Sequence, residues 1–230
     1  MREFYCAPSM KRTVIPELLD TNSGTPEEIA ASLADLRGIN RRFGGLATTQ
    51  ALIEKVTGDS TRLSILEVAA GESELPGIVR PELKERGIDI EVTSLDRSPL
   101  HFDRRTNGSR KVAGDALALP FSGASFDVVC SCLFVHHLSP EEVVRHVNEG
   151  LRVCRKAVLI NDLVRSRMHL AAVYAGMPLF RSRITRHDAP ASVHRAYTPE
   201  EMVGLLKQTV ATKVEINRHF LFRMGVVIWK

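Results

Sequence analysis

The sequence has few cysteines, a single tryptophan and no long apolar run. Its four cysteines lack the CxxC spacing of metal and redox motifs, so we interpret them as small buried residues and expect no metal ion. The longest apolar candidate, residues 170–180, is shorter than the about 20 residues of a membrane helix. The N-terminus lacks the apolar core of a signal peptide. These absences predict a soluble, cytoplasmic protein.

The sequence also lacks a large excess of either positive or negative charge. The formal net charge is +4, and charged residues make up 25% of the 230 residues. This mild excess of positive charge tolerates an anionic ligand without requiring one, and a nucleic-acid partner is not expected. The length fits one α/β domain with a sizeable core. The sequence gives no indication of an oligomeric state.

Three segments carry the same helix-start pattern, a hydroxyl residue followed by Pro-Glu-Glu. They are residues 25–28, 139–142 and 198–201. The hydroxyl suits the N-cap, proline suits the first helical position, and the second glutamate can reach back to the cap amide. Helices are therefore predicted to begin at residues 26, 140 and 199. With a further helix predicted at 48–56, residues 1–60 form a helical N-terminal extension or lid ahead of a main domain at 61–230.

Short apolar strands alternate with helices in the main domain. Strands are predicted at 63–68, 88–95, 110–113, 126–133 and 157–160, and helices at 76–86 and 140–153. This alternation is typical of a parallel sheet with helices on both faces. Residues 212–216 and 220–228 are joined by a short link and predict an antiparallel hairpin. The expected fold is α/β: a Rossmann-like, seven-stranded, mostly parallel sheet with an antiparallel C-terminal hairpin.

Acidic residues end three successive predicted strands. They are Glu67, Asp96 and Asp115. Ligands of open α/β sheets bind at the carboxyl ends of the strands, where carboxylates can hold ribose hydroxyls and an adenine amino group. The loop after the first strand has one glycine, Gly71, and not the GxGxxG of a dinucleotide site. Because further acids surround this loop, it favours a cationic ligand over a pyrophosphate.

The segment LEVAAGESELP resembles motif I of class I S-adenosylmethionine (SAM)-dependent methyltransferases, and is most similar to the ubiquinone/menaquinone-biosynthesis C-methyltransferases. GDALALPFSGASFDVV and CSCLFVHHLSPEEVVRHVNEGLRV resemble later motifs of these enzymes, so the resemblance covers roughly residues 60–160. It implies that Glu67 and Gly71 contact the methionine end of SAM and that Asp96 binds its ribose. Asp115 and Ala116 would bind adenine. The remaining implied SAM contacts are Ala69, Arg97, Cys132 and Ser73, which replaces the usual glycine; Phe43 and Gly45, just before the first strand, are expected to help close the site.

His136 and His137 follow the fourth predicted strand, beside the expected position of the SAM methyl group. Histidine has a pKa suited to accepting a proton from a hydroxyl nucleophile, so either is a candidate base. An anchoring or pocket-shaping role is the alternative. Because adjacent side chains diverge, only one is expected to point into the site.

Residues 163–198 form an insertion that is rich in arginine and histidine and contains the apolar run LAAVYAGMPLF. An apolar wall with clustered cations suggests a pocket for a hydrophobic acceptor with an anionic or phenolic group, although a solvated basic lid would look the same. The predicted substrate-binding residues are Asp162, Arg165, Tyr174, His187, Arg195 and Tyr197.

The favoured function is methylation of a small, partly hydrophobic acceptor, with O-methylation of a phenol, enol or polyketide-like molecule ahead of C-methylation of a quinone precursor. The (D/N)PP(Y/F) signature of base methylation is absent after the fourth strand, which disfavours nucleic-acid acceptors. Two other classes remain: an NAD-dependent oxidoreductase and a non-catalytic SAM-fold binding protein.

Overall fold

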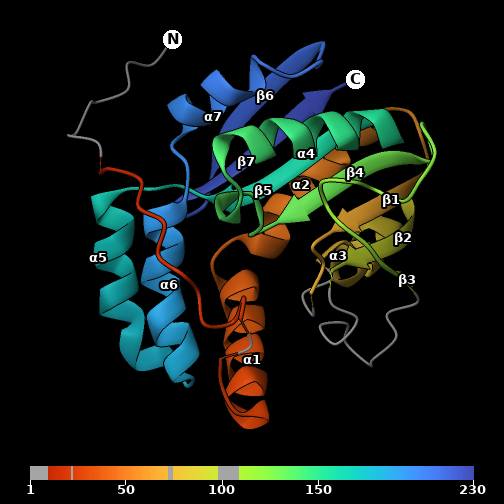
Figure 1. Cartoon of the computed structure of the whole chain (residues 1–230). Helices are drawn as coiled ribbons and strands as arrows, with labels where there is room; N and C mark the ends of the chain where they lie inside the picture. The colour runs from red at the N-terminus through yellow and green to blue at the C-terminus, as the bar shows by residue number, and fades with distance from the viewer. Residues whose placement is uncertain (1–9, 22, 72–74, 98–108) are drawn as a thin grey trace.

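The computed structural model describes residues 10–21, 23–71, 75–97 and 109–230, and it contains one seven-stranded sheet of order β3-β2-β1-β4-β5-β7-β6 (Figure 1). The strands are β1 (Arg62–Val68), β2 (Asp89–Asp96), β3 (Arg110–Ala113), β4 (Phe126–Cys132), β5 (Cys154–Leu163), β6 (Lys213–His219) and β7 (Arg223–Trp229). β1 to β5 pair in parallel, and β7 runs antiparallel to both β5 and β6. The predicted sheet and C-terminal hairpin are therefore confirmed.

The helices are α1 (Pro26–Arg42), α2 (Gly45–Thr57), α3 (Leu75–Glu85), α4 (Pro140–Val153), α5 (Arg167–Gly176), α6 (Arg183–Arg195) and α7 (Pro199–Leu206), with short 3-10 helices η2 (Val135–His137) and η3 (Met177–Leu179). Three helices begin at the predicted residues 26, 140 and 199, two begin one to three residues before the predicted ones, and α5 and α6 were not predicted. Thr25, Ser139 and Thr198 each form a complete capping box at the start of α1, α4 and α7. No helix in the described ranges is both long and apolar enough to cross a bilayer.

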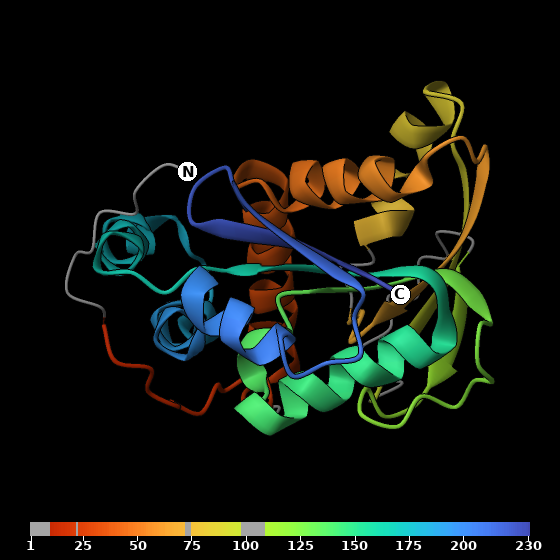
Figure 2. The same ribbon diagram turned by 90° about the horizontal axis from the view of Figure 1, so that it is seen from above.

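Helices cover both faces of the sheet, as Figure 2 shows from above, with α2 and α3 on one side and α4 and α7 on the other. Neighbouring residues of β5 serve the two layers in turn, because successive side chains of a strand point to opposite faces. Leu159 joins the cluster that includes Leu52 of α2, whereas Ile160 joins the cluster that includes Val147 of α4. Full burial of each such aliphatic side chain stabilises the fold by about 1.5–3 kcal/mol.

The helices α1, α5 and α6 form a separate group beyond one end of the sheet (Figure 1). The predicted insertion thus folds as helices, and α6 packs against both α1 and α5. Residues 10–21, here called the N-terminal strap, lie along α6. The amide of Thr13 donates to the carbonyl of His194, and the amides of Leu18 and Leu19 donate to the carboxylate of Asp188.

A buried arginine joins the N-terminal helices to the sheet. Arg223 of β7 is 1% exposed, and its guanidinium donates to the carbonyl of Phe43 and to the side-chain oxygens of Asn40 and Asn161. The amide group of Asn161 in turn donates to the carbonyl of Gly45. These bonds satisfy polar groups that would be costly to bury alone, and they fix the junction between α1 and α2.

Gly45 is expected to be intolerant of a side chain. A Cβ there would lie 2.5 Å from Oδ1 of Asn40 and 2.8 Å from its Cα, so backbone would have to move. We expect Gly45→Ala to lower the free energy of unfolding by about 1–3 kcal/mol, measured by chemical denaturation. The control Gly204→Ala, at an exposed position of α7 with open space for a Cβ, should instead raise it by about 0.5–1 kcal/mol. A stable Gly45→Ala protein would contradict the tight junction.

Candidate functional site

Two of the predicted acids lie at the carboxyl edge of the sheet and hold the loop between them. Glu67 is 2% exposed and accepts a hydrogen bond from the amide of Leu75, the first residue of α3. Asp96, 8% exposed, accepts from the amide of Gly71. The parallel register that pairs Val68 with Leu95 places both strand ends side by side. The structure therefore brings Glu67, Gly71 and Asp96 together, as predicted.

The loop after β1 has an unusual backbone. Ala69 has a φ of +53° and Gly71 a φ of +50°. The left-handed region costs a residue with a Cβ roughly 1–2 kcal/mol, so Ala69 is held there by its surroundings. No atom of the described residues lies within 4 Å of the place where a Cβ on Gly71 would be. This leaves room for a ligand beside the loop. The predicted contact Ser73 lies outside the described residues.

Asp115 follows β3 at the same edge, and it is exposed. Its carboxylate accepts from the amide of Leu117 and lies 3.9 Å from a guanidinium nitrogen of Arg97. The amide of Gly114 donates to the carbonyl of Asp96, which ties the end of β3 to the end of β2. Asp96, Arg97 and Asp115 thus occupy neighbouring positions.

The backbone of Ala116 is hydrogen-bonded to a buried histidine of α4. Nδ1 of His146 donates to the carbonyl of Ala116 at 3.2 Å, and burial lowers the pKa of His146. The histidine therefore stays neutral and acts as a support for this turn.

Cys132 lies at the end of β4, beside Asn161 of β5. It lines a small cavity of about 10 Å³ together with Glu67 and Thr49 of α2. Burial raises the pKa of the Cys132 thiol to about 12. The side chain is therefore a neutral thiol next to Glu67, and not a thiolate nucleophile.

The main cavity of the described structure has a volume of about 310 Å³ and lies among the strap, α1, α5, α6 and the β6–β7 turn. Most of its wall is apolar: Leu36, Ile39, Phe43, Val173, Phe180 and Leu221 contribute. Glu17, Asp20, His136 and His137 supply its polar end. Phe43, predicted as a cofactor contact, thus lines this cavity, while Gly45 packs against Asn40.

His136 is held at that polar end by a carboxylate. It is 3% exposed, its Nδ1 lies 2.7 Å from Oδ1 of Asp162, and its backbone amide donates to Oδ2 of the same residue. The other ring nitrogen, Nε2, lies 3.7 Å from Oε1 of Glu17. The pair with Asp162 sets the orientation of the imidazole ring, and the nearby His136 lowers the pKa of Asp162 against the effect of burial.

His137 enters the same cavity, so the expectation that only one histidine does so is wrong. Its Nδ1 lies 3.0 Å from Oδ2 of Asp20, and its Nε2 lies 4.0 Å from Oε2 of Glu17. The ring centroids of His136 and His137 are 4.2 Å apart. Both belong to η2, where successive side chains are separated by a third of a turn and not by the half turn of a strand. Two neighbouring rings can therefore face one cavity.

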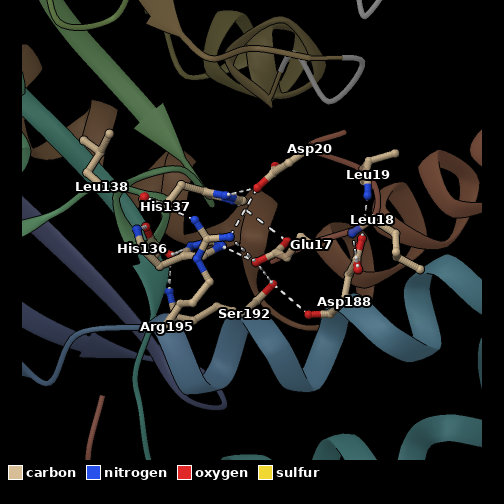
Figure 3. Close-up of polar contacts among 12 residues, drawn as sticks. Glu17, Leu18, Leu19, Asp20, His136, His137, Leu138, Asp188, Ser192 and Arg195 are labelled. Carbon is tan, nitrogen blue, oxygen red and sulfur yellow. Dashed lines mark hydrogen bonds and ion pairs between the residues drawn. The ribbon is translucent and has the colours of Figure 1, made fainter. Parts of the chain in front are cut away.

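The carboxylate of Glu17 lies near the Nε2 atoms of both histidines (Figure 3). Glu17 accepts a hydrogen bond from the hydroxyl of Ser192. A guanidinium nitrogen of Arg195 lies 3.6 Å from Oε1 of Glu17 and 3.2 Å from Oδ2 of Asp20. Burial raises the pKa of Glu17 to about 7. We call Glu17, Asp20, His136, His137, Asp162 and Arg195 the histidine cluster.

Two of the predicted substrate residues, Asp162 and Arg195, therefore belong to this cluster. Two others hold loops together. The guanidinium of Arg165 donates to the carbonyls of Met10 and Ala196 and to Glu201. The hydroxyl of Tyr197 donates to the carbonyl of Leu138.

The last two predicted substrate residues, Tyr174 and His187, are exposed, and neither is among the described residues that line the main cavity. The side chain of Tyr174 is 55% exposed on α5. Nδ1 of His187 lies 2.8 Å from Asp188, whose carboxylate also holds the strap.

Glu17 and Asp20 belong to the histidine cluster but were not predicted as site residues from the sequence. They lie in an irregular strap with no helical or strand periodicity, and their partners are more than a hundred residues away. The one visible signal is the stretch Pro16-Glu17-Leu18-Leu19-Asp20, in which two acids flank apolar residues. Arg223 was missed because a single arginine in an apolar strand has no distinguishing pattern.

Comparison with known proteins agrees with the fold. Residues 66–160 match the methyltransferase domain family. A plantazolicin methyltransferase, BpumL, solved with S-adenosylhomocysteine (SAH) and a substrate analogue, is 13% identical with a TM-score of 0.68, covering 93% of this chain and 94% of that one. A possible histamine N-methyltransferase from Thermotoga maritima is 14% identical with a TM-score of 0.62, covering 88% and 97%. Among curated proteins no sequence match was found.

These likenesses do not single out the ubiquinone/menaquinone group, so that finer assignment stays a prediction. The match to a methyltransferase domain also disfavours the alternative of an NAD-dependent oxidoreductase. The domain over residues 66–160, together with the sheet order, identifies the protein as a SAM-dependent methyltransferase with the class I fold.

Proposed function

We propose that the protein transfers the methyl group of SAM to a hydroxyl of a small, partly hydrophobic acceptor, such as a phenol, an enol or a polyketide-like molecule. The observation that carries this proposal is the main cavity, in which an apolar wall ends at two histidines held by carboxylates. Because these histidines follow β4 directly, the polar end of the cavity adjoins the edge where the SAM-binding acids lie.

SAM would lie across the carboxyl ends of β1 to β4. In this arrangement Glu67 and Gly71, with Ala69 and Cys132, hold the methionine end. Asp96 holds the ribose hydroxyls, and Asp115 with Ala116 and Arg97 holds the adenine. The acid-rich edge complements the positive charge of the sulfonium, and the left-handed backbone at Ala69 and Gly71 turns the chain sharply beside the proposed ligand position.

Methyl transfer is an in-line displacement, in which the carbon–sulfur bond of SAM breaks as the carbon–oxygen bond of the product forms. The acceptor oxygen reacts best as an anion, so the site must stabilise that anion and exclude water. His136 and His137 face the cavity and are the groups that would activate the acceptor oxygen. Asp162 and Asp20 act as positioning residues, because each holds one imidazole ring.

The N-terminal extension, predicted as a lid, supplies the cavity walls needed to exclude water. The strap contributes Glu17 and Asp20, and α1 contributes Leu36, Ile39 and Phe43. We propose that these elements, together with the predicted insertion at 163–198, close over the acceptor.

C-methylation of a quinone-type precursor remains the second candidate. An enolic or phenolic acceptor has a nucleophilic carbon next to its oxygen, and the apolar cavity accepts either orientation. The position of the new methyl group in the product, read by NMR, decides between the two.

The proposal is tested by incubating the purified protein with isotopically labelled SAM and a panel of phenols, enols and polyketide-like molecules. Label transfer to at least one oxygen is the expected result. In parallel, SAM and SAH should raise the unfolding temperature while NAD should not, since a ligand stabilises a protein in proportion to its occupancy. Binding of SAM without transfer to any acceptor would favour a non-catalytic binding protein.

A further inference from the structure

Three atoms suited to binding a metal ion converge at the polar end of the main cavity. They are Nε2 of His136, Nε2 of His137 and the carboxylate of Glu17 (Figure 3). The carboxylate oxygens lie 3.7 Å and 4.0 Å from the two nitrogens, and all three ligand atoms lie within 4.8 Å of one another. They come from segments that are more than a hundred residues apart, so the fold assembles them.

The far side of each ring fixes which nitrogen carries the proton. Nδ1 of His136 lies 2.7 Å from a carboxylate oxygen of Asp162, and Nδ1 of His137 lies 3.0 Å from a carboxylate oxygen of Asp20. A neutral ring that donates from Nδ1 presents the lone pair of Nε2 to Glu17. Two lone pairs and a carboxylate then face one another, and a cation placed between them would bind to all three. Metal-binding histidines are usually held by a carboxylate in this way.

The charges of the cluster leave room for such a cation. Glu17, Asp20 and Asp162 are three carboxylates, and Arg195 is the one permanently charged cation that contacts Glu17 and Asp20 among the described residues. Glu17 and Asp162 are buried while Asp20 is exposed, so Arg195 alone leaves part of the negative charge of the buried carboxylates uncompensated when they are ionised. Uncompensated buried charge is costly, and a divalent ion would balance it.

We propose that Glu17, His136 and His137 bind one divalent transition-metal ion, such as Zn²⁺ or Mn²⁺, at the polar end of the main cavity. Two imidazoles and one carboxylate are a common ligand set for these ions. Tetrahedral ligands at about 2.1 Å from an ion lie roughly 3.4 Å apart, so the three ligand atoms, which lie within 4.8 Å of one another, would have to draw closer around the ion. This proposal departs from the sequence-based expectation of no metal ion.

The open position of the ion would hold the acceptor oxygen, an assignment that rests on the proposed function. A phenol or enol would bind as its anion and release its proton to solvent, because metal binding lowers the pKa of a coordinated hydroxyl. The oxygen then attacks the methyl carbon, the carbon–sulfur bonding pair stays on sulfur, and neutral SAH and the ether product leave. The acceptor class is thus narrowed to molecules with an ionisable oxygen.

Metal binding is tested on untagged protein, freed of metal with a chelator and titrated with Zn²⁺ and with Co²⁺, whose visible spectrum reports its ligands. One ion per chain is expected. Glu17→Gln and His137→Ala should abolish saturable binding, and Asp20→Asn, at an exposed strap position, should weaken it about 10–100-fold. The controls His194→Ala on α6 and Glu200→Gln on α7 should bind as the wild type does. No bound ion, or equal binding by Glu17→Gln and His137→Ala, would overturn the site.

Activity separates this proposal from the proposed function. Chelated protein should lose methyl transfer, and a stoichiometric amount of Zn²⁺ or Mn²⁺ should restore it, with SAM affinity unchanged throughout. Full transfer by metal-free protein would overturn the role of the ion in activating the acceptor while supporting the methyltransferase function, with the histidines acting directly. Absence of transfer with metal-loaded protein and every acceptor would count against the proposed function, whereas the spectrum of bound Co²⁺ would still report on the site.

Discussion

Asp96→Ala is expected to remove measurable SAM binding, with at least a roughly 100-fold loss of affinity. The carboxylate would accept two ribose hydroxyls, and charge-assisted hydrogen bonds contribute about 1.5–3 kcal/mol each. It also holds the amide of Gly71, so the loop that receives the methionine end would lose its anchor. Isothermal titration with SAM and SAH measures the effect. Because Asp96 is nearly buried at a strand end, the folded state of the variant is checked by circular dichroism.

Glu91→Ala is the matched control for Asp96→Ala. Glu91 lies on the same strand, β2, but its side chain is 70% exposed. Among the described residues it forms a salt bridge only with the exposed Arg62. Exposed pairs of this kind contribute about 0–1 kcal/mol to stability, so SAM affinity should stay within about twofold. An Asp96→Ala protein that binds SAM like this control would contradict the assignment of the ribose site.

The helix starts could be predicted from sequence because their cause is local. Thr25, Ser139 and Thr198 each meet their capping glutamate three residues later, and all three boxes form. The strand order follows a similar logic, since alternating apolar strands and helices leave few sheet arrangements. β5 is longer than predicted because Asn161 and Asp162 near its end still pair with β7, while Cys154 at its start pairs with Phe126 of β4.

The SAM edge and the histidine cluster differ in how much the sequence could reveal. Glu67, Asp96 and Asp115 could be found because strand ends converge at one edge whatever the loops do. Glu17 reaches His136 only through a strap tied to α6 by Asp188, and this docking depends on contacts between residues about 170 positions apart. No local pattern encodes such a contact. The sequence therefore predicted the acids of the proposed cofactor edge and four of the six residues of the histidine cluster, and it missed the two that the strap supplies.

His136→Ala is expected to lower kcat for methyl transfer by about 10²–10³-fold while leaving SAM affinity within about twofold. Loss of one group that stabilises a developing anion has an effect of this size, and the substitution leaves Glu67, Gly71 and Asp96 in place. Single-turnover transfer from labelled SAM measures the chemical step apart from product release. The opposite pattern is expected for Asp96→Ala, whose loss appears in binding.

Asp162→Asn tests whether the ring orientation of His136 matters, because the amide keeps the shape of the carboxylate and removes its charge. We expect an intermediate loss of kcat, with KM for the acceptor little changed, since Asp162 acts through His136 and not on the acceptor. His194→Ala serves as the control histidine and should leave kcat unchanged. If His136→Ala lost SAM affinity as strongly as Asp96→Ala, the division between a cofactor edge and an acceptor-activating cluster would be wrong, because one site would then be serving both roles.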